Sequence, residues 1–202
     1  MELLALRSLL SNKPLLIFDF DGTIADTSPL HADAFRQVLG PLGISVHYPS
    51  IAGLKTADVI RLCARASGQE LSADVLTALV VAKQKLVRQM IAQQLKPLPG
   101  VDQFLQWACQ HHQLSMATSG SRGTVELALK KLGYLQLFDP LICSDDVKHA
   151  KPSPDIFLNV LSQTGFLPDQ AVIFEDSDAG IAAAKSAGIM CIDVRGLDWK
   201  FD

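Results

Sequence analysis

The sequence predicts an α/β fold in which helices cover both faces of a Rossmann-like parallel sheet and a helical domain is inserted after the first strand. Three observations predict it. Short apolar segments alternate with helical segments beyond residue 100 of the 202-residue chain, which is typical of parallel sheets. Another short apolar segment, residues 15–18, stands near the N-terminus. Between these parts lies a long stretch of helical composition without a convincing strand.

The N-terminal part is predicted to hold one strand and four helices. A short helix over residues 3–10 precedes the strand, which we expect to be buried because four apolar residues in a row suit a strand covered on both faces. Helices are then expected over residues 30–39, from 56 or 57 to about 67, and from 73 to about 95. The first of these follows Pro29, a residue suited to a first helical turn.

The proline-rich segment 96–100 indicates a crossing between domains. Beyond it we expect helices over 101–111, 124–132, 155–165 and 178–187, with strands over 114–118, 141–143, 171–174 and 190–194. The predicted core domain therefore comprises residues 1–25 and 99–202, and residues 26–98 form a helical cap domain. Because the insertion leaves the carboxyl edge of the sheet, where ligands bind in such folds, we expect the cap to lie over the ligand site.

Composition and charge exclude several classes of protein. The net charge of −3 gives no basic field for nucleic acid. No apolar run approaches the ~18 residues that span a bilayer, and the N-terminus opens with an acid, unlike a signal peptide. The four cysteines are widely separated and form no C-x-x-C pair, as is typical of a reducing compartment. We expect a cytoplasmic protein without nucleic-acid or membrane partners, with a monomer as the default state.

Two aspartates, Asp19 and Asp21, follow the predicted first strand directly, and Gly22 then turns the chain. Two carboxylates held close together repel each other unless a cation joins them or one of them keeps its proton. Oxygen ligands of this kind suit Mg²⁺. The end of this strand therefore predicts a metal site at the carboxyl edge of the sheet.

Three more polar segments fall at the same predicted edge. Ser119 and Gly120 follow the second strand, where hydroxyls and backbone amides at a helix start suit either a phosphate cradle or an ordinary helix cap. Lys151 precedes a proline-framed helix start and is a candidate to neutralise phosphoryl oxygens. Glu175 and Asp176 follow the strand over 171–174; Asp176 is the stronger candidate ligand, whereas Glu175 is a candidate to orient waters or a lysine.

Taken in order, with a helical insertion after the first, these segments resemble the haloacid dehalogenase superfamily, and more closely its β-phosphoglucomutase-like phosphatases with a helical cap. The resemblance extends from about residue 15 to residue 194. Each motif alone is short, so the resemblance depends on finding all four on predicted strand ends. The segments are Asp19-Phe20-Asp21-Gly22-Thr23, Thr118-Ser119-Gly120-Ser121, Lys151-Pro152-Ser153-Pro154-Asp155 and Glu175-Asp176-Ser177.

The resemblance implies a role for each core residue. Asp19 would attack phosphorus and form an aspartyl phosphate, and Asp21 would protonate the departing alcohol and then activate water. Mg²⁺ would bind the Asp19 carboxylate, the Asp21 carbonyl and Asp176, with Glu175 supporting it through water. Ser119 and the Gly120 amide would hold phosphoryl oxygens, while Lys151 balances charge. The substrate would be a small phosphorylated metabolite, most simply a sugar phosphate, because a closing cap excludes large substrates.

The cap carries further candidates. His31 stands on the first cap helix, where relatives place a histidine that couples cap closure to the active site, although a partly buried helix histidine is the alternative. Gly53, Lys55 and Thr56 resemble the loop that contacts the leaving group. Thr56 stands where the mutases carry an arginine for a second phosphate, and Lys55 is a candidate to compensate.

Two alternatives remain beside an Mg²⁺-dependent phosphatase. The first is a phosphosugar mutase on the same scaffold, which would return the phosphoryl group to a sugar and not to water; the missing arginine favours water. The second is a phospho-accepting switch like a response-regulator receiver, which also uses acids, a Ser or Thr and a Lys on a parallel sheet. A receiver is shorter, lacks a cap and does not need the second aspartate.

Overall fold

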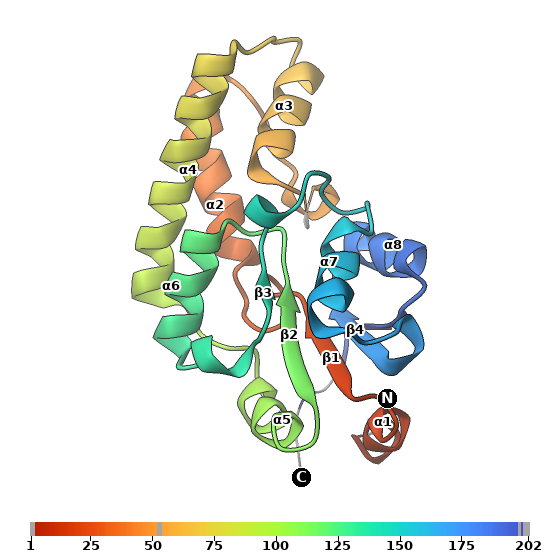
Figure 1. The fold of residues 1–202 in the computed structure, drawn as a ribbon. Helices are drawn as coiled ribbons and strands as arrows, with labels where there is room; N and C mark the ends of the chain where they lie inside the picture. The colour runs from red at the N-terminus through yellow and green to blue at the C-terminus, as the bar shows by residue number, and fades with distance from the viewer. Residues whose placement is uncertain (1–2, 52–53, 198, 200–202) are drawn as a thin grey trace.

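The computed structural model describes residues 3–51, 54–197 and 199. Its centre is a five-stranded sheet in the order β3-β2-β1-β4-β5, and every neighbouring pair is parallel (Figure 1). The α/β prediction is therefore confirmed. The strands are β1 (Leu15–Phe18), β2 (Gln113–Ala117), β3 (Leu141–Ile142), β4 (Ala171–Glu175) and β5 (Met190–Asp193).

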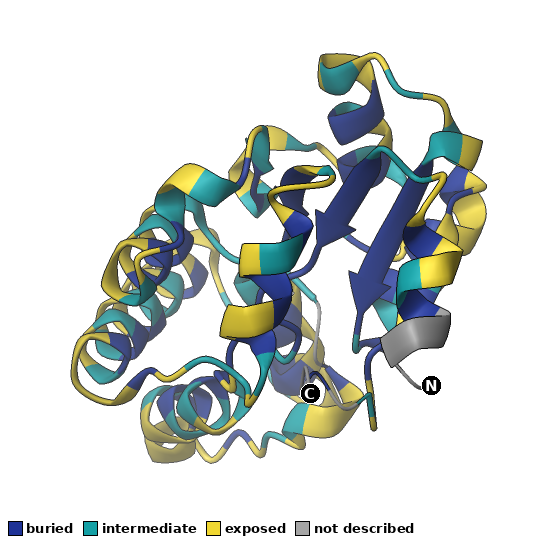
Figure 2. Ribbon diagram, turned by 90° about the horizontal axis from the view of Figure 1, so that it is seen from below, coloured by how far each residue is buried: buried dark blue, intermediate teal, exposed yellow. Residues whose placement is uncertain are grey.

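The apolar run of β1 occupies the middle of the sheet, and its side chains alternate between two cores. Leu16 and Phe18 belong to one buried cluster, with apolar residues of α1, α5 and α6, whereas Leu15 and Ile17 belong to another with residues of α7 and α8. Both faces of the sheet are therefore covered, and the central strands β1 and β4 are buried throughout, whereas the edge strand β5 is partly exposed (Figure 2). The helices of this part are α1 (Leu3–Leu10), α5 (Val101–Ala108), α6 (Arg122–Leu132), α7 (Asp155–Thr164) and α8 (Asp178–Ala187).

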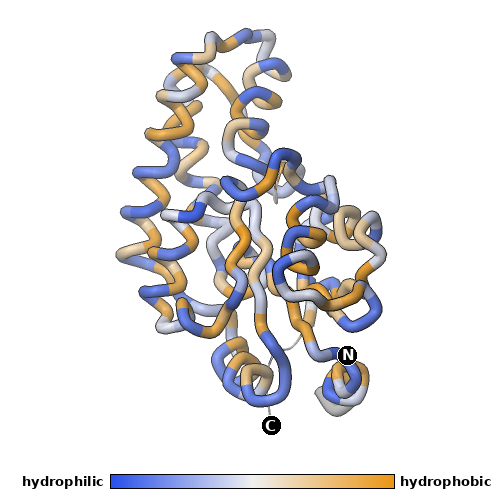
Figure 3. Tube along the Cα trace, viewed as in Figure 1, coloured by the Kyte–Doolittle hydropathy of each residue, from blue (hydrophilic) through white to orange (hydrophobic). Residues whose placement is uncertain are grey.

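Between β1 and α5 lie three helices, α2 (Ser28–Leu39), α3 (Thr56–Ala66) and α4 (Ala73–Gln94), at the end of the sheet to which the β-arrows point (Figure 1). They share a separate apolar cluster that includes Phe35, Ile60 and Leu76. Apolar and polar stretches alternate along each of them (Figure 3), as expected for helices that pack on one face only. The second half of α4 is different, because Val87 and Ile91 join the main core.

The chain enters and leaves this helical insertion (residues 26–98) at one place. Ala25 forms an antiparallel bridge with Pro97, and the Leu98 amide donates to the Ile24 carbonyl at 2.9 Å. The two connections therefore lie side by side at the carboxyl edge of the sheet. Short 3₁₀ helices complete the fold: η1 (Gly40–Leu42), η2 (Tyr48–Ser50), η3 (Leu135–Leu137), η4 (Ser144–Asp146) and η5 (Pro168–Gln170).

The observed elements differ from the predicted ones mainly at their ends. Helix α2 begins at Ser28 because Pro29 fits its first turn. Helix α6 begins at Arg122, two residues before the predicted start. Helix α5 ends at Ala108, three residues before the predicted end. Within the described part of the chain, no helix combines the length and the apolar character needed to cross a bilayer.

Candidate active site

The site begins with a buried lysine that joins three strands. Lys151 Nζ donates to Asp19 Oδ1 at 2.6 Å, to Glu175 Oε1 at 2.6 Å and to the Ala117 carbonyl at 3.0 Å. Its side chain is fully buried. The Asp19 amide donates to the Phe174 carbonyl at 3.0 Å and so continues the pairing of β1 with β4 by one residue. All three protons of the ammonium are therefore used at the ends of β1, β2 and β4.

Negative charge exceeds positive charge at this edge of the sheet. Burial raises the pKa of Asp19 well above its usual range; Lys151 opposes this, whereas Glu175 and Asp176 add to it. Burial and then Glu175 and Asp21 raise the pKa of Asp176 to about 7. Burial lowers the pKa of Lys151, but its bonds to Asp19 and Glu175 prevail and raise it. A further cation beside Asp19 and Asp176 would return both to their ionised forms.

Glu175 is held by its neighbours. Its Oε2 accepts from the Ser177 amide at 2.7 Å and from Ser177 Oγ at 2.9 Å, while its Oε1 accepts from Lys151. A Cβ on Gly180 would lie 1.9 Å from Oε1, so only glycine allows this approach. Both oxygens of Glu175 are therefore engaged in positioning Lys151 and the loop after β4.

Asp176 is brought against the loop that follows β1. A Cβ on Gly22 would lie 2.1 Å from Asp176 Oδ2, and Gly22 has a φ of +83°, so glycine is required there on two grounds. Thr23 Oγ1 lies 3.4 Å from Asp176 Oδ1. This contact places Asp176 beside the Asp19 and Asp21 segment, as the sequence predicts for a shared site.

The donor set fits a divalent cation. Among the described residues, no three His, Cys, Asp or Glu side chains form a ready-made metal cage. Mg²⁺ commonly uses only one or two carboxylates and completes its shell with water and substrate phosphate. Asp19 and Asp176, with the excess negative charge described above, meet that requirement.

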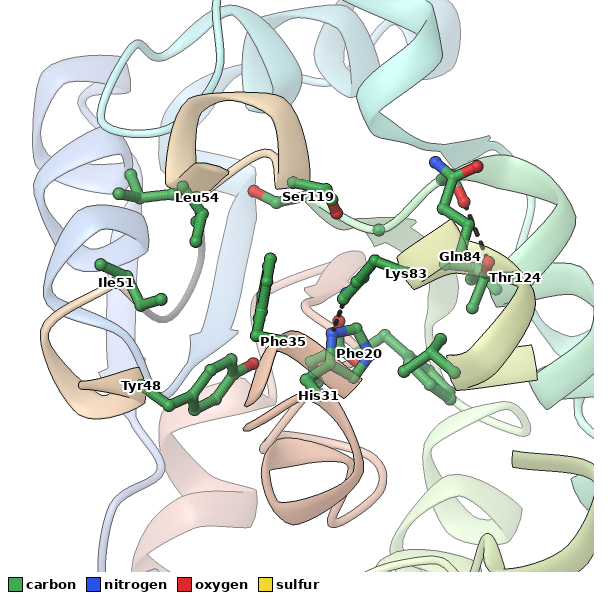
Figure 4. Close-up of a pocket in the computed structure, with 17 residues that line it drawn as sticks. Phe20, His31, Phe35, Tyr48, Ile51, Leu54, Lys83, Gln84, Ser119 and Thr124 are labelled. Carbon is green, nitrogen blue, oxygen red and sulfur yellow. Dashed lines mark hydrogen bonds and ion pairs between the residues drawn. The ribbon is translucent and has the colours of Figure 1, made fainter. Parts of the chain in front are cut away.

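A second set of contacts leads from Asp21 into the helical insertion. Thr27 Oγ1 donates to Asp21 Oδ1 at 2.5 Å, and His31 Nε2 lies 3.5 Å from the same oxygen. Lys83 Nζ lies 2.9 Å from His31 Nδ1 (Figure 4). Because the ammonium can only donate, Nδ1 accepts and the ring proton of neutral His31 is on Nε2, facing Asp21.

Burial lowers the pKa of both His31 and Lys83. It lowers the pKa of His31 to about 4, although Asp21 opposes the shift, so the imidazole is neutral at physiological pH. Burial lowers the pKa of Lys83 to about 8, again against Asp21. Lys83 Nζ also lies 4.5 Å from the centre of the Phe35 ring. The sequence analysis missed Lys83, although it precedes Val87 by four residues and Ile91 by eight, a spacing that places it on the buried stripe of α4.

The loop after β2 forms another wall of the site. The Thr118 side chain is buried, and its Oγ1 accepts from the Gly120 amide at 3.2 Å, which leaves its own proton available to an anion. Ser121 Oγ lies 2.9 Å from Thr124 Oγ1, to which Arg88 Nε of α4 donates at 3.1 Å. The loop is thus tied to the helical insertion.

An inner cavity lies between this loop and the helical insertion (Figure 4). Its volume is about 40 Å³, far below the ~300–1,000 Å³ of typical ligand pockets, so the insertion is closed over it. Of the residues predicted from the sequence, it is lined by Asp21, His31, Thr56, Ser119 and Gly120. Lys55 is not brought into it, because its Nζ donates to the Val147 carbonyl at 2.9 Å. Gly53 lies outside the described residues.

The family model and the related proteins that match this chain point to the same family. Residues 16–194 match the family model of the haloacid dehalogenase-like hydrolases. The chain is 39% identical over 183 residues to the fructose-1-phosphate phosphatase YqaB of Escherichia coli strain K12, an alignment that covers 90% of this chain and 96% of the relative. It is also 33% identical over 178 residues to a phosphorylated carbohydrates phosphatase of Thermotoga maritima, covering 86% and 81% of the two chains.

Solved structures agree. CbbY from Rhodobacter sphaeroides in complex with phosphate superposes with a TM-score of 0.81 at 27% identity, covering 93% of this chain and 88% of CbbY. The β-phosphoglucomutase of Clostridium difficile superposes with a TM-score of 0.83 at 22% identity, covering 93% and 88%, and supports the fold alone.

Proposed function

Because this chain belongs to the haloacid dehalogenase-like hydrolases, we propose that it is an Mg²⁺-dependent phosphatase that hydrolyses a sugar phosphate through an aspartyl phosphate on Asp19. The family points to a divalent metal cofactor, and a site with few carboxylates and a substrate phosphate suits Mg²⁺. The observation that carries the proposal is the buried contact of Lys151 with Asp19 and Glu175 at the carboxyl edge of the sheet.

In the first step, an oxygen of Asp19 attacks phosphorus and the bond from phosphorus to the sugar oxygen breaks. Lys151 holds Asp19 Oδ1 and so fixes the orientation of the carboxylate. An anionic nucleophile approaches an anionic phosphoryl group only where cations offset the repulsion. Lys151 supplies one positive charge, and Mg²⁺ held by Asp19, the Asp21 carbonyl and Asp176 would supply the rest when bound.

Asp21 serves as the acid and then the base. Thr27 and His31 both face its Oδ1, which leaves Oδ2 to give a proton to the departing sugar oxygen and later to take one from water. A Cβ on Gly120 would lie 3.8 Å from Oδ2, so this oxygen faces the loop after β2. Its position suits proton transfer beside a phosphoryl group held by Thr118, Ser119 and Gly120.

The helical insertion serves as the cap that excludes bulk water. His31 and Lys83 belong to it; His31 contacts Asp21, and Lys83 contacts His31 from behind. Closure therefore completes the acid/base group as it seals the cavity. The substrate class is supported by two relatives named as a fructose-1-phosphate phosphatase and a phosphorylated carbohydrates phosphatase.

Hydrolysis is favoured over phosphosugar mutase activity by the residues around the cavity. A mutase must grip a bisphosphate, whose second phosphate calls for a cation from the cap loop. In that loop Thr56, which lines the cavity, is neutral, and the Lys55 ammonium is held by the Val147 carbonyl. The cation Lys83 also lines the cavity, but it stands on α4 against His31. The aspartyl phosphate is accordingly transferred to water.

Replacing Asp19 with asparagine tests the proposal. We expect phosphate release from a panel of sugar phosphates to fall by a factor of about 10³ or more, because the nucleophile is lost. Asp26→Asn, which alters an exposed aspartate on the same loop, should keep wild-type turnover. Near-native turnover by the Asp19 variant, or wild-type activity that is indifferent to a chelator, would contradict the proposal.

A further inference from the structure

Tyr48, a residue outside the motifs discussed so far, stands at the boundary of two hollows. It begins η2, in the connection from α2 to α3. One hollow is the inner cavity; the other, the outer cleft, has a volume of about 400 Å³ and lies between η2 and the start of α8. Tyr48 and Leu54 line both of them. These two side chains therefore separate the closed inner cavity from a cleft large enough for a ligand.

The phenol of Tyr48 is directed at His31 and Phe35, on the Asp21 side of the site. Its ring centre lies 6.3 Å from that of His31 and 6.3 Å from that of Phe35, and its hydroxyl points toward these residues in Figure 4. Burial, and then the carboxylates of Asp21, Asp176 and Asp19, raise the pKa of Tyr48 well above its usual range. The phenol therefore stays protonated and remains a hydrogen-bond donor at every pH at which the enzyme works.

The surroundings of the phenol are suited to an uncharged, hydroxyl-bearing group. Ser28, which the phenol contacts, and Ser50 both line the outer cleft. Among the described residues that line it, Arg195 is the cation, and its guanidinium is bound to Asp178 at 2.7 Å and to Asp193 at 2.6 Å. A second phosphate would meet an excess of negative charge here, because these two aspartates outnumber Arg195, and Asp176 also lines the cleft, whereas sugar hydroxyls would meet hydroxyl partners.

We propose that Tyr48 determines the specificity of the site: its hydroxyl donates a hydrogen bond to a hydroxyl of the leaving group, and its ring, with Leu54, limits that group to a single sugar unit. This inference rests on the proposed phosphatase activity and deepens it by naming the leaving group. A site that hydrogen-bonds a substrate hydroxyl discriminates strongly against esters that lack one, because its polar group is then left unpaired.

Two variants of the full chain, assayed with Mg²⁺, separate the two parts of the inference. Tyr48→Phe removes only the hydroxyl. We expect the ratio of kcat/KM for a hexose phosphate to kcat/KM for p-nitrophenyl phosphate, whose leaving group carries no further hydroxyl, to fall about tenfold. Tyr48→Ala also opens the partition, so kcat/KM for trehalose 6-phosphate relative to the hexose phosphate should rise about tenfold.

The matched control is Tyr134→Phe. Tyr134 is also buried, but its hydroxyl contacts Asp102 in the first turn of α5, away from the site, so this variant should keep both wild-type ratios. Circular dichroism verifies that each variant is folded. Unchanged ratios in both Tyr48 variants, or equal losses on every ester, would overturn the inference while leaving the phosphatase proposal intact. A wild-type enzyme that releases phosphate from none of the esters would overturn both.

Discussion

Replacing Lys83 with methionine should stabilise the protein while impairing its activity. Lys83 is only 2% exposed, and burial lowers its pKa from 10.5 to about 8. Since one pKa unit corresponds to about 1.4 kcal/mol, the buried ammonium lowers the free energy of unfolding by about 3 kcal/mol at neutral pH. Methionine fills a similar space but loses the bond to His31, worth about 1–2 kcal/mol. We therefore expect a net gain of about 1–2 kcal/mol.

The stability that the Lys83→Met variant gains should depend on pH. Between pH 8 and 10.5 the unfolded chain binds more protons at Lys83 than the folded protein, so wild-type stability rises with pH across this window. The advantage of the variant should therefore be largest below pH 8 and shrink toward pH 10.5. Activity should fall at the same time, because His31 loses the partner that fixes its ring beside Asp21.

Thermal unfolding followed by circular dichroism measures the effect. A gain of 1–2 kcal/mol corresponds to a rise in Tm of roughly 2–8 °C for a protein of this size. Lys85→Met, which alters an exposed lysine of the same helix, is the control and should show no such rise. A variant less stable than wild type below pH 8, or an advantage that persists unchanged at high pH, would refute the reasoning.

Two further predictions concern the charges of the site. Lys151→Met leaves the Asp19 and Glu175 carboxylates buried without their cation, so urea denaturation should show a loss of about 3–5 kcal/mol in the free energy of unfolding; a loss below 1 kcal/mol would count against the buried contact. The raised pKa of Asp176 means that the folded protein loses stability as pH rises from 3.8 through about 7. Asp176→Asn should therefore stabilise the metal-free protein above pH 7, by at most about 4 kcal/mol. The variant should also lose the rise in Tm that Mg²⁺ gives the wild-type protein. A Tm that responds to Mg²⁺ equally in both proteins would exclude Asp176 as a ligand.

The core of the fold was accessible from the sequence because each strand is a short apolar run with a turn at its end. All four residues of β1 are apolar because the strand is buried on both faces. The acidic and hydroxyl residues of the site come directly after such strands, and parallel strands end at one edge of the sheet. Proximity of Asp19 and Asp176 therefore followed from topology, whereas Lys151 stands nine residues after β3 and reaches Asp19 through its long side chain.

The helical insertion was less accessible, because its contacts depend on how three helices pack. Lys83 meets His31 across 52 residues of sequence, and nothing local distinguishes it from Lys85. Tyr48 belongs to a connection without periodicity, so its direction is set by the packing of α2 and α3. Lys55 was expected to face the substrate, yet its long side chain reaches the Val147 carbonyl.

Trapping the covalent intermediate tests the nucleophile most directly. Acetyl phosphate has a good leaving group and does not need the acid, whereas hydrolysis of the intermediate does need Asp21 as the base. An Asp21→Asn variant mixed with acetyl phosphate and Mg²⁺ and then quenched in acid should therefore accumulate phosphoenzyme. Mass spectrometry should find one phosphoryl group on the peptide that contains Asp19, removable by hydroxylamine and absent after a further Asp19→Asn substitution. A phosphoryl group on another residue, or one that survives the Asp19 substitution, would contradict the account.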